Sequence, residues 1–92
     1  MITLNVFYQA KPGMRERFTA EVKDSGLLAA IRAEEGCGRY EYFAALEDPD
    51  RLFLLEQWED DAALEAHQQS GNMTRLRAIK EKYMVSTDIK RY

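Results

Sequence analysis

Apolar and polar residues alternate with two different periods along this chain, and each change of period marks a new element. Residues 2–9 are rich in β-branched and aromatic side chains and are followed by the turn sequence KPG, which is typical of a strand and its end. From Met14 up to the sequence EEGCG, apolar residues recur at helical spacing. Gly26 is a poor helix former, so the pattern predicts a kink or an interruption near residues 24–26.

Strand-like alternation returns in the middle of the chain as a predicted β-hairpin. The segment GRYEYFAAL places Tyr40 and Tyr42 on one face, and RLFLLEQW places Leu52, Leu54, Glu56 and Trp58 on one face. The turn sequence EDPD joins the two segments, because the residue before a proline is pushed towards an extended backbone. Two strands joined this closely are expected to pair antiparallel.

The last third of the chain predicts a broken helix and a final strand. The acidic sequence EDD is typical of a helix N-terminus, and a short helix is expected from about Ala62. The sequence SGN interrupts it, with Asn72 as the expected cap of a second helix, and MVSTDIKRY predicts the last strand. The order βαββαβ over residues 1–92 predicts one α+β domain with a ferredoxin-like fold, a four-stranded antiparallel sheet with helices on one face.

The composition of the chain argues against two classes of partner, nucleic acids and membranes. A formal net charge of −3 leaves no excess of basic residues for a phosphate backbone, so no nucleic acid is expected. No apolar run approaches the roughly 20 residues that cross a bilayer, and the N-terminus lacks a secretory pattern, so no membrane partner and a cytoplasmic location are expected. The single cysteine, Cys37, cannot form a disulfide within the chain and is interpreted as a small buried residue rather than a reactive thiol.

The sheet face that the helices leave bare carries apolar side chains at several predicted positions. A chain of 92 residues buries only a modest share of its surface, so a partner subunit would add to a thin core. Two sheets stacked face to face would cover the bare face. The sequence therefore predicts a homodimer through the open face of the sheet.

The densest motifs resemble those of a known family. The segments EEGCGRYEYF, a DP turn and LLEQWEDDAALEAHQQS resemble the antibiotic biosynthesis monooxygenase family, which includes quinol monooxygenases. This resemblance implies two sheets paired in a dimeric α+β barrel. It leaves several activities open, because such proteins include cofactor-free oxygenases, haem-degrading enzymes and an isomerase of autoinducer-2 breakdown.

The resemblance also assigns candidate site residues. Glu56 and Trp58 match the E-x-W of the family, and His67, the only histidine, matches its helix histidine. Many members have a second histidine in a P-H pair, whose place is held here by Gly71 and Asn72. His67 is therefore the candidate catalytic base, although a lone histidine beside an apolar helix face is also compatible with core packing.

Further residues are expected to bind the substrate. Trp58, Phe7 and Tyr40 would stack on an aromatic ring, and Asn5 would donate a hydrogen bond to a phenolate. Glu56 shares a face with apolar residues, where a carboxylate is costly unless it is paired. For Glu56 an ion pair with an arginine is the alternative interpretation.

The expected substrates are dioxygen and a small quinol or polyphenol, oxidised without a cofactor. No spacing of His, Cys and acidic residues predicts a metal site, and no glycine-rich phosphate loop is present. Haem is disfavoured, because the haem-degrading members of the family have a tryptophan in the helix after the third strand and a histidine that begins the last helix. This sequence has neither residue at those places. Two alternatives stay open: an autoinducer-2-type isomerase with Arg39 or Arg51 binding a phosphate, and a dimer that binds a small ligand without catalysis.

Overall fold

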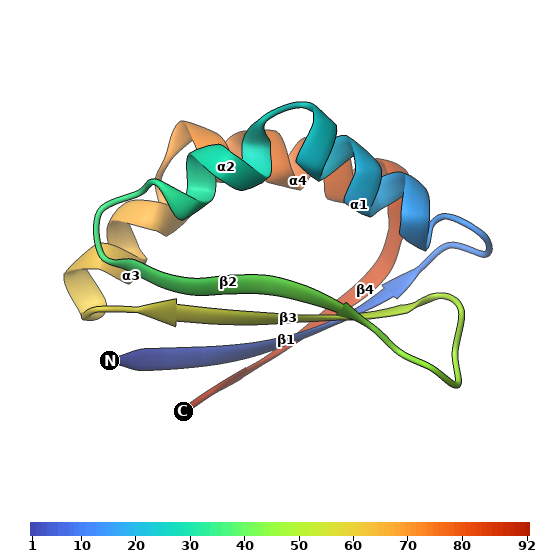
Figure 1. Ribbon diagram of the computed structural model, residues 1–92, viewed down its shortest axis with the longest axis horizontal. Coiled ribbons are helices and arrows are strands. Elements are labelled where there is room, and N and C mark those ends of the chain that lie inside the picture. The colour runs from blue at the N-terminus through green and yellow to red at the C-terminus, as the bar shows by residue number, and fades with distance from the viewer.

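The computed structural model describes residues 1–92 and shows one sheet with helices on one side (Figure 1). The sheet has the strand order β2-β3-β1-β4, and all neighbouring strands are antiparallel, so the predicted ferredoxin-like α+β fold is confirmed. In Figure 1, α1, α2 and α4 lie over one face and α3 lies at one end of it. The elements are β1 Ile2–Ala10, α1 Arg15–Asp24, α2 Leu27–Arg32, β2 Cys37–Ala44, β3 Arg51–Trp58, α3 Asp61–Gln68, α4 Gly71–Tyr83 and β4 Met84–Arg91.

The predicted interruption of the first helical segment is confirmed at Gly26. This glycine has φ of 83°, in the left-handed region that glycine adopts without a steric cost, and it separates α1 from α2. The break lets both short helices turn an apolar side towards the sheet. Phe18 and Val22 of α1 and Leu27 and Ile31 of α2 are all fully buried.

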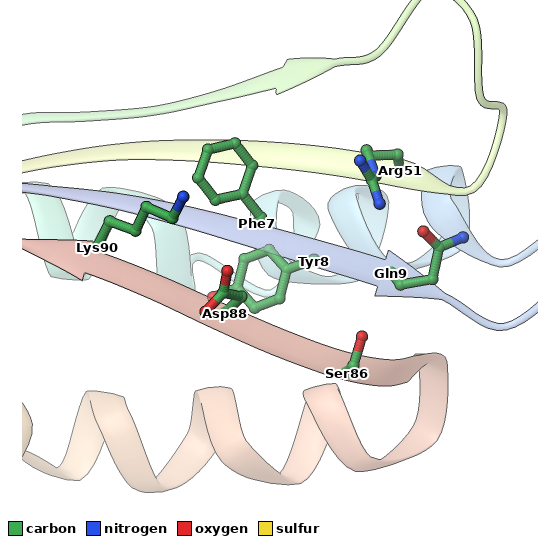
Figure 2. Close-up of a pocket in the computed structure, with 7 residues that line it drawn as sticks. All are labelled: Phe7, Tyr8, Gln9, Arg51, Ser86, Asp88 and Lys90. Atoms are coloured by element: carbon green, nitrogen blue, oxygen red, sulfur yellow. The ribbon is translucent and has the colours of Figure 1, made fainter.

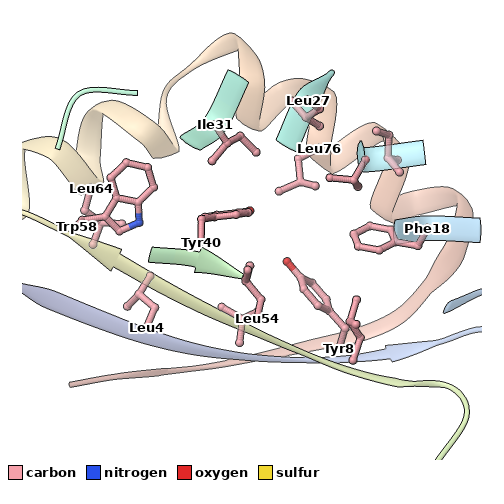
Figure 3. Packing of buried hydrophobic residues seen from close by; sticks show 14 residues of the cluster. Leu4, Tyr8, Phe18, Leu27, Ile31, Tyr40, Leu54, Trp58, Leu64 and Leu76 are labelled. Carbon is pink, nitrogen blue, oxygen red and sulfur yellow. The ribbon is translucent and has the colours of Figure 1, made fainter. Parts of the chain in front are cut away.

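The inner face of the sheet, defined as the face under the helices, is built by strict alternation. Leu4, Val6 and Tyr8 of β1 are buried, while the residues between them are only half-buried. The same period places four buried residues of β3 beside them, Leu52, Leu54, Glu56 and Trp58. Figure 3 shows the apolar residues of this face packed with apolar residues of the helices in the layer between them.

The two helices of the second half begin at side-chain caps. The carboxylate of Asp60 accepts a hydrogen bond from the backbone N–H of Ala63, as the EDD sequence predicts for a helix start. The hydroxyl of Ser70 accepts from the N–H of Met73 at the start of α4. The prediction that Asn72 caps this helix is therefore wrong: Ser70 is the cap, and Asn72 lies inside the first turn.

The outer face of the sheet, opposite the helices, carries an aromatic cluster of Phe7, Phe43 and Phe53. The ring centroids of Phe7 and Phe53 lie 5.1 Å apart, and those of Phe43 and Phe53 lie 6.0 Å apart. No helix crosses this face, and Phe43 is 42% exposed. None of the helices combines the length and the apolar character needed to span a membrane.

Candidate functional site

The single histidine and the single tryptophan meet at one end of the inner face. Trp58 is the last residue of β3, and His67 lies in the last turn of α3. Their rings are stacked, with centroids 4.4 Å apart and planes inclined by 24°. Both side chains are buried, with exposures of 0% for Trp58 and 2% for His67, so the imidazole lies in the interior against the indole.

Glu56 lies beside these two rings. Its Oε1 atom accepts a hydrogen bond of 3.0 Å from the indole N–H of Trp58 and lies 3.9 Å from Nε2 of His67. The alternative interpretation, an ion pair between Glu56 and an arginine, is wrong, because its partners are the indole and the imidazole. Burial raises the pKa of Glu56 above its usual value, although the Trp58 hydrogen bond and the His67 charge oppose this rise.

The other side of the imidazole contacts a second carboxylate that the sequence did not reveal. Nδ1 of His67 lies 3.0 and 3.1 Å from the two carboxylate oxygens of Glu34, which belongs to the turn between α2 and β2. The side-chain amide of Asn72 donates a hydrogen bond of 3.1 Å to Oε2 of Glu34. His67 therefore lies between two carboxylates, with Glu34 at Nδ1 and Glu56 at Nε2.

Tyrosine side chains extend the polar cluster along the inner face. Tyr40 pairs with Glu56 across the strands, and its ring centroid lies 6.1 Å from that of His67. The hydroxyls of Tyr40 and Tyr42 are buried without a hydrogen-bond partner. In Figure 3 the hydroxyl ends of Tyr8 and Tyr40 lie in the layer between sheet and helices. Burial raises the pKa of all three tyrosines, and the nearby Glu56 charge adds to this, so they remain neutral donors.

Two predicted site residues lie elsewhere. Asn5 and Phe7 alternate with the buried residues of β1 and belong to the outer face, opposite His67. The expectation that they share a pocket with His67 is therefore wrong within one chain. Phe7 lines a hollow of about 290 Å³ together with Gln9 and Arg51. Figure 2 shows these side chains. Like Arg51, Arg39 is an exposed strand residue; it pairs with Glu41 at 3.0 Å.

The interior around His67 is filled by side chains. Hollows open at five places on the surface, and none of them is lined by His67, Trp58 or Glu56. The rings of His67 and Trp58 are in contact, so no open space for a substrate separates them in this structure. No group of three or more His, Cys, Asp and Glu side chains is arranged to bind a metal ion.

The structure is a ferredoxin-like α+β sheet with a buried cluster of Glu56, Trp58 and His67 under its helices. The chain matches the family model described as antibiotic biosynthesis monooxygenase over residues 1–79. It is 33% identical over 72 residues to "Putative monooxygenase YcnE" of Bacillus subtilis, a match that covers 78% of this chain and 74% of that protein. The chain therefore belongs to the antibiotic biosynthesis monooxygenase family, as its motifs predict.

Other relatives agree with this assignment. "Probable quinol monooxygenase YgiN" of Escherichia coli is 30% identical over 84 residues, covering 79% of this chain and 78% of that protein. A crystal structure of a protein from Pseudomonas aeruginosa has a TM-score of 0.86 and 33% identity, covering 99% of this chain and 90% of that chain. A crystal structure of a conserved protein from Methanosarcina mazei has a TM-score of 0.87 and 28% identity, covering 99% and 89% of the two chains.

Proposed function

We propose that this protein is a cofactor-independent monooxygenase that oxidises a quinol or a related polyphenol with dioxygen. The observation that carries the proposal is the buried imidazole of His67, stacked on Trp58 with a carboxylate at each ring nitrogen. Family membership and the names of the two relatives support the same reaction class.

The chemistry needs no outside reductant. One quinol and one molecule of dioxygen give one hydroxyquinone and one molecule of water. This equation balances, because the quinol supplies all four electrons that dioxygen takes up. One oxygen atom replaces a ring hydrogen as a hydroxyl group, and the other leaves as water. The protein has to remove the phenolic proton, since the phenolate is the form that passes an electron to dioxygen.

The gap between His67 and Glu56 is suited to this proton transfer. The 3.9 Å between Nε2 of His67 and Oε1 of Glu56 is too long for a hydrogen bond. A hydroxyl oxygen placed to one side of the gap could lie about 2.8 Å from both atoms. It would donate its hydrogen to Nε2 of His67 and accept one from Glu56 in the protonated form, which burial of Glu56 favours by raising its pKa. We expect His67 to accept the phenolic proton there, with Glu56 as the second group in contact with the substrate oxygen.

The buried tyrosines support binding of a phenolate. Transfer from a phenol of pKa about 10 to an ordinary imidazole of about 6.5 is uphill by roughly 5 kcal/mol, so the anion must be stabilised. Tyr40 and Tyr42 have hydroxyls without partners, and an oxygen-bearing substrate would supply the missing acceptor. Because the interior is closed, a ring can enter only when side chains or the helical cover move.

A second copy of the chain is the proposed partner. Phe7, Phe43 and Phe53 form an aromatic cluster on the outer face that no helix covers. Two sheets pack face to face at about 10 Å, which would bury both clusters at once. We therefore propose a homodimer through the outer face, which leaves the His67 cluster of each chain on its own inner side.

Oxygen consumption with a panel of reduced quinones tests the function. We expect the wild-type protein to accelerate oxygen uptake with at least one quinol, and His67→Ala to lower this rate at least about tenfold. Gln68→Ala is the matched control, because Gln68 is the next residue of α3 and is exposed. No stimulation by any quinol, or equal rates in His67→Ala and wild type, would contradict the proposal. A ligand that copurifies with the protein but is never turned over would instead favour the alternative that the dimer binds a small ligand without catalysis.

A further inference from the structure

We infer that Glu34, held by Asn72, is a positioning residue that keeps the hydrogen of His67 on Nδ1 and so presents Nε2 as the proton-accepting atom. Its consequence for turnover rests on the proposed function, but its consequence for the imidazole does not. Neither Glu34 nor Asn72 belongs to the E-x-W and histidine motif, and Glu34 lies 33 positions before His67 in the sequence.

The hydrogen-bond chemistry of Glu34 fixes the hydrogen on one nitrogen. An ionised carboxylate can only accept hydrogen bonds, and both of its oxygens lie within 3.1 Å of Nδ1. A nitrogen facing an acceptor at this distance must carry the hydrogen, because two lone pairs would otherwise repel each other. A neutral His67 ring then has its free lone pair on Nε2, the atom that faces Glu56 at 3.9 Å.

Asn72 restricts Glu34 in turn. Its amide donates to Oε2 of Glu34 over 3.1 Å, so the carboxylate is held from α4 while it accepts from α3. Asn72 occupies the place where many family members carry a second histidine. In this chain that position therefore supplies an amide donor to the carboxylate rather than another imidazole.

The pair of Glu34 and His67 is similar to catalytic dyads in which a carboxylate orients a histidine that exchanges a proton with the substrate. In such dyads the carboxylate selects the tautomer and stabilises the imidazolium that forms when the ring accepts a proton. The side chains that face the His67 ring are Glu34 at Nδ1, Glu56 at Nε2, Trp58 on its face and Tyr40 at its edge. Among them only Glu34 lies within hydrogen-bond distance of a ring nitrogen.

Nitrogen NMR of the imidazole tests this inference without any substrate. His67 is the only histidine, so labelling histidine with ¹⁵N gives one pair of ring signals. At a pH where the ring is neutral, we expect a protonated Nδ1 and a bare Nε2 in the wild-type protein. In Glu34→Gln the amide can also donate to Nδ1, so the population should move measurably towards the tautomer with hydrogen on Nε2.

Glu35→Gln is the matched control, because it removes the same charge from the next residue, which is exposed. It should leave both ring signals unchanged. Asn72→Ala should give a smaller shift in the same direction as Glu34→Gln, and it keeps the test available if Glu34→Gln does not fold. Ring signals that are identical in wild type, Glu34→Gln and Asn72→Ala would overturn the inference.

Turnover provides a second readout. With a quinol that the wild type oxidises, Glu34→Gln should lower kcat by about tenfold or more with a small change in KM, since Glu34 does not contact the substrate. A changed tautomer with an unchanged kcat would overturn the catalytic role of Glu34. If no quinol is oxidised by the wild type, the proposed function fails, while the NMR result still decides whether Glu34 positions the ring.

Discussion

The two faces of the sheet are built from the same strands but carry different kinds of polar group. On the inner face Glu56 is buried, and its carboxylate lies next to the indole of Trp58 and the imidazole of His67. On the outer face Arg39 and Glu41 pair in contact with solvent, a kind of ion pair that adds little to stability. The comparison teaches that the face covered by helices holds the candidate chemistry, whereas the face without helices is suited to association.

The largest expected difference between the faces is in stability. Leu54 and Leu55 are neighbours on β3, but Leu54 is fully buried on the inner face and Leu55 is half-buried on the outer face. Leu54→Ala should lower the free energy of unfolding by about 2–5 kcal/mol, because it leaves a cavity in a packed core. Leu55→Ala should cost about 1 kcal/mol or less in the monomer.

Urea unfolding at protein concentrations low enough to keep the chain monomeric would measure both leucine variants. Equal losses would mean that the outer face is packed as tightly as the inner one. That result would argue against the outer face as the dimer interface that its aromatic cluster indicates.

A charge on the outer face should have the next largest effect. In Phe53→Lys the ammonium group would be buried at the centre of the proposed dimer interface, so the dissociation constant should rise at least about tenfold, equal to about 1.4 kcal/mol. Leu46→Lys is the control, because this fully exposed residue lies in the turn between β2 and β3. Sedimentation velocity should show a dimer for wild type and Leu46→Lys and a shift to monomer for Phe53→Lys.

A wild-type protein that sediments as a monomer at micromolar concentration would contradict the proposed dimer directly. An intact dimer in Phe53→Lys would place the interface elsewhere on the surface. Either result would leave the inner-face cluster unaffected, since it is formed within a single chain.

The sequence predicted the elements well because each depends on local patterns. The alternation of β3 correctly placed Glu56 and Trp58 on one face, and Gly26 correctly marked the break between α1 and α2. The family motif placed His67 and Trp58 in one site, but nothing in the local spacing predicts that their rings are in contact, because that depends on how α3 meets the end of β3.

The errors arose where several segments meet. Asn5 and Phe7 alternate with Tyr8, but alternation alone does not say which face the helices cover, so both were placed on the wrong side. Glu34 was missed because its contact with His67 depends on how the turn after α2 meets α3 in space. Glu34 is one of two adjacent glutamates before Gly36, and the sequence does not distinguish it from the exposed Glu35. The local sequence SGN predicts a cap at Asn72, whereas its contact with Glu34 depends on how α4 meets the turn after α2.

The smallest expected effect is a change in how stability depends on pH, and it separates a buried carboxylate from a surface one. Burial raises the pKa of Glu56, so the folded state holds this proton more tightly than the unfolded chain does. The resulting stability is complete below the unfolded value of about 4.3 and is lost as the pH rises through the higher folded value. Glu56→Gln does not titrate, so its stability relative to wild type should increase as the pH rises from about 4 and then level off.

Glu21 should show the opposite sign. Hydrogen bonds from Lys82 and Tyr83 lower the pKa of this helix-surface carboxylate, so its contribution is present above the unfolded value and is lost as the pH falls through the folded value. Glu21→Gln should therefore lose stability relative to wild type as the pH rises. Urea unfolding of the three proteins over a pH series measures both slopes. A Glu56→Gln slope with the sign of Glu21→Gln would show that Trp58 and His67 stabilise the Glu56 carboxylate by more than burial costs, so that the pKa of Glu56 is lowered and not raised.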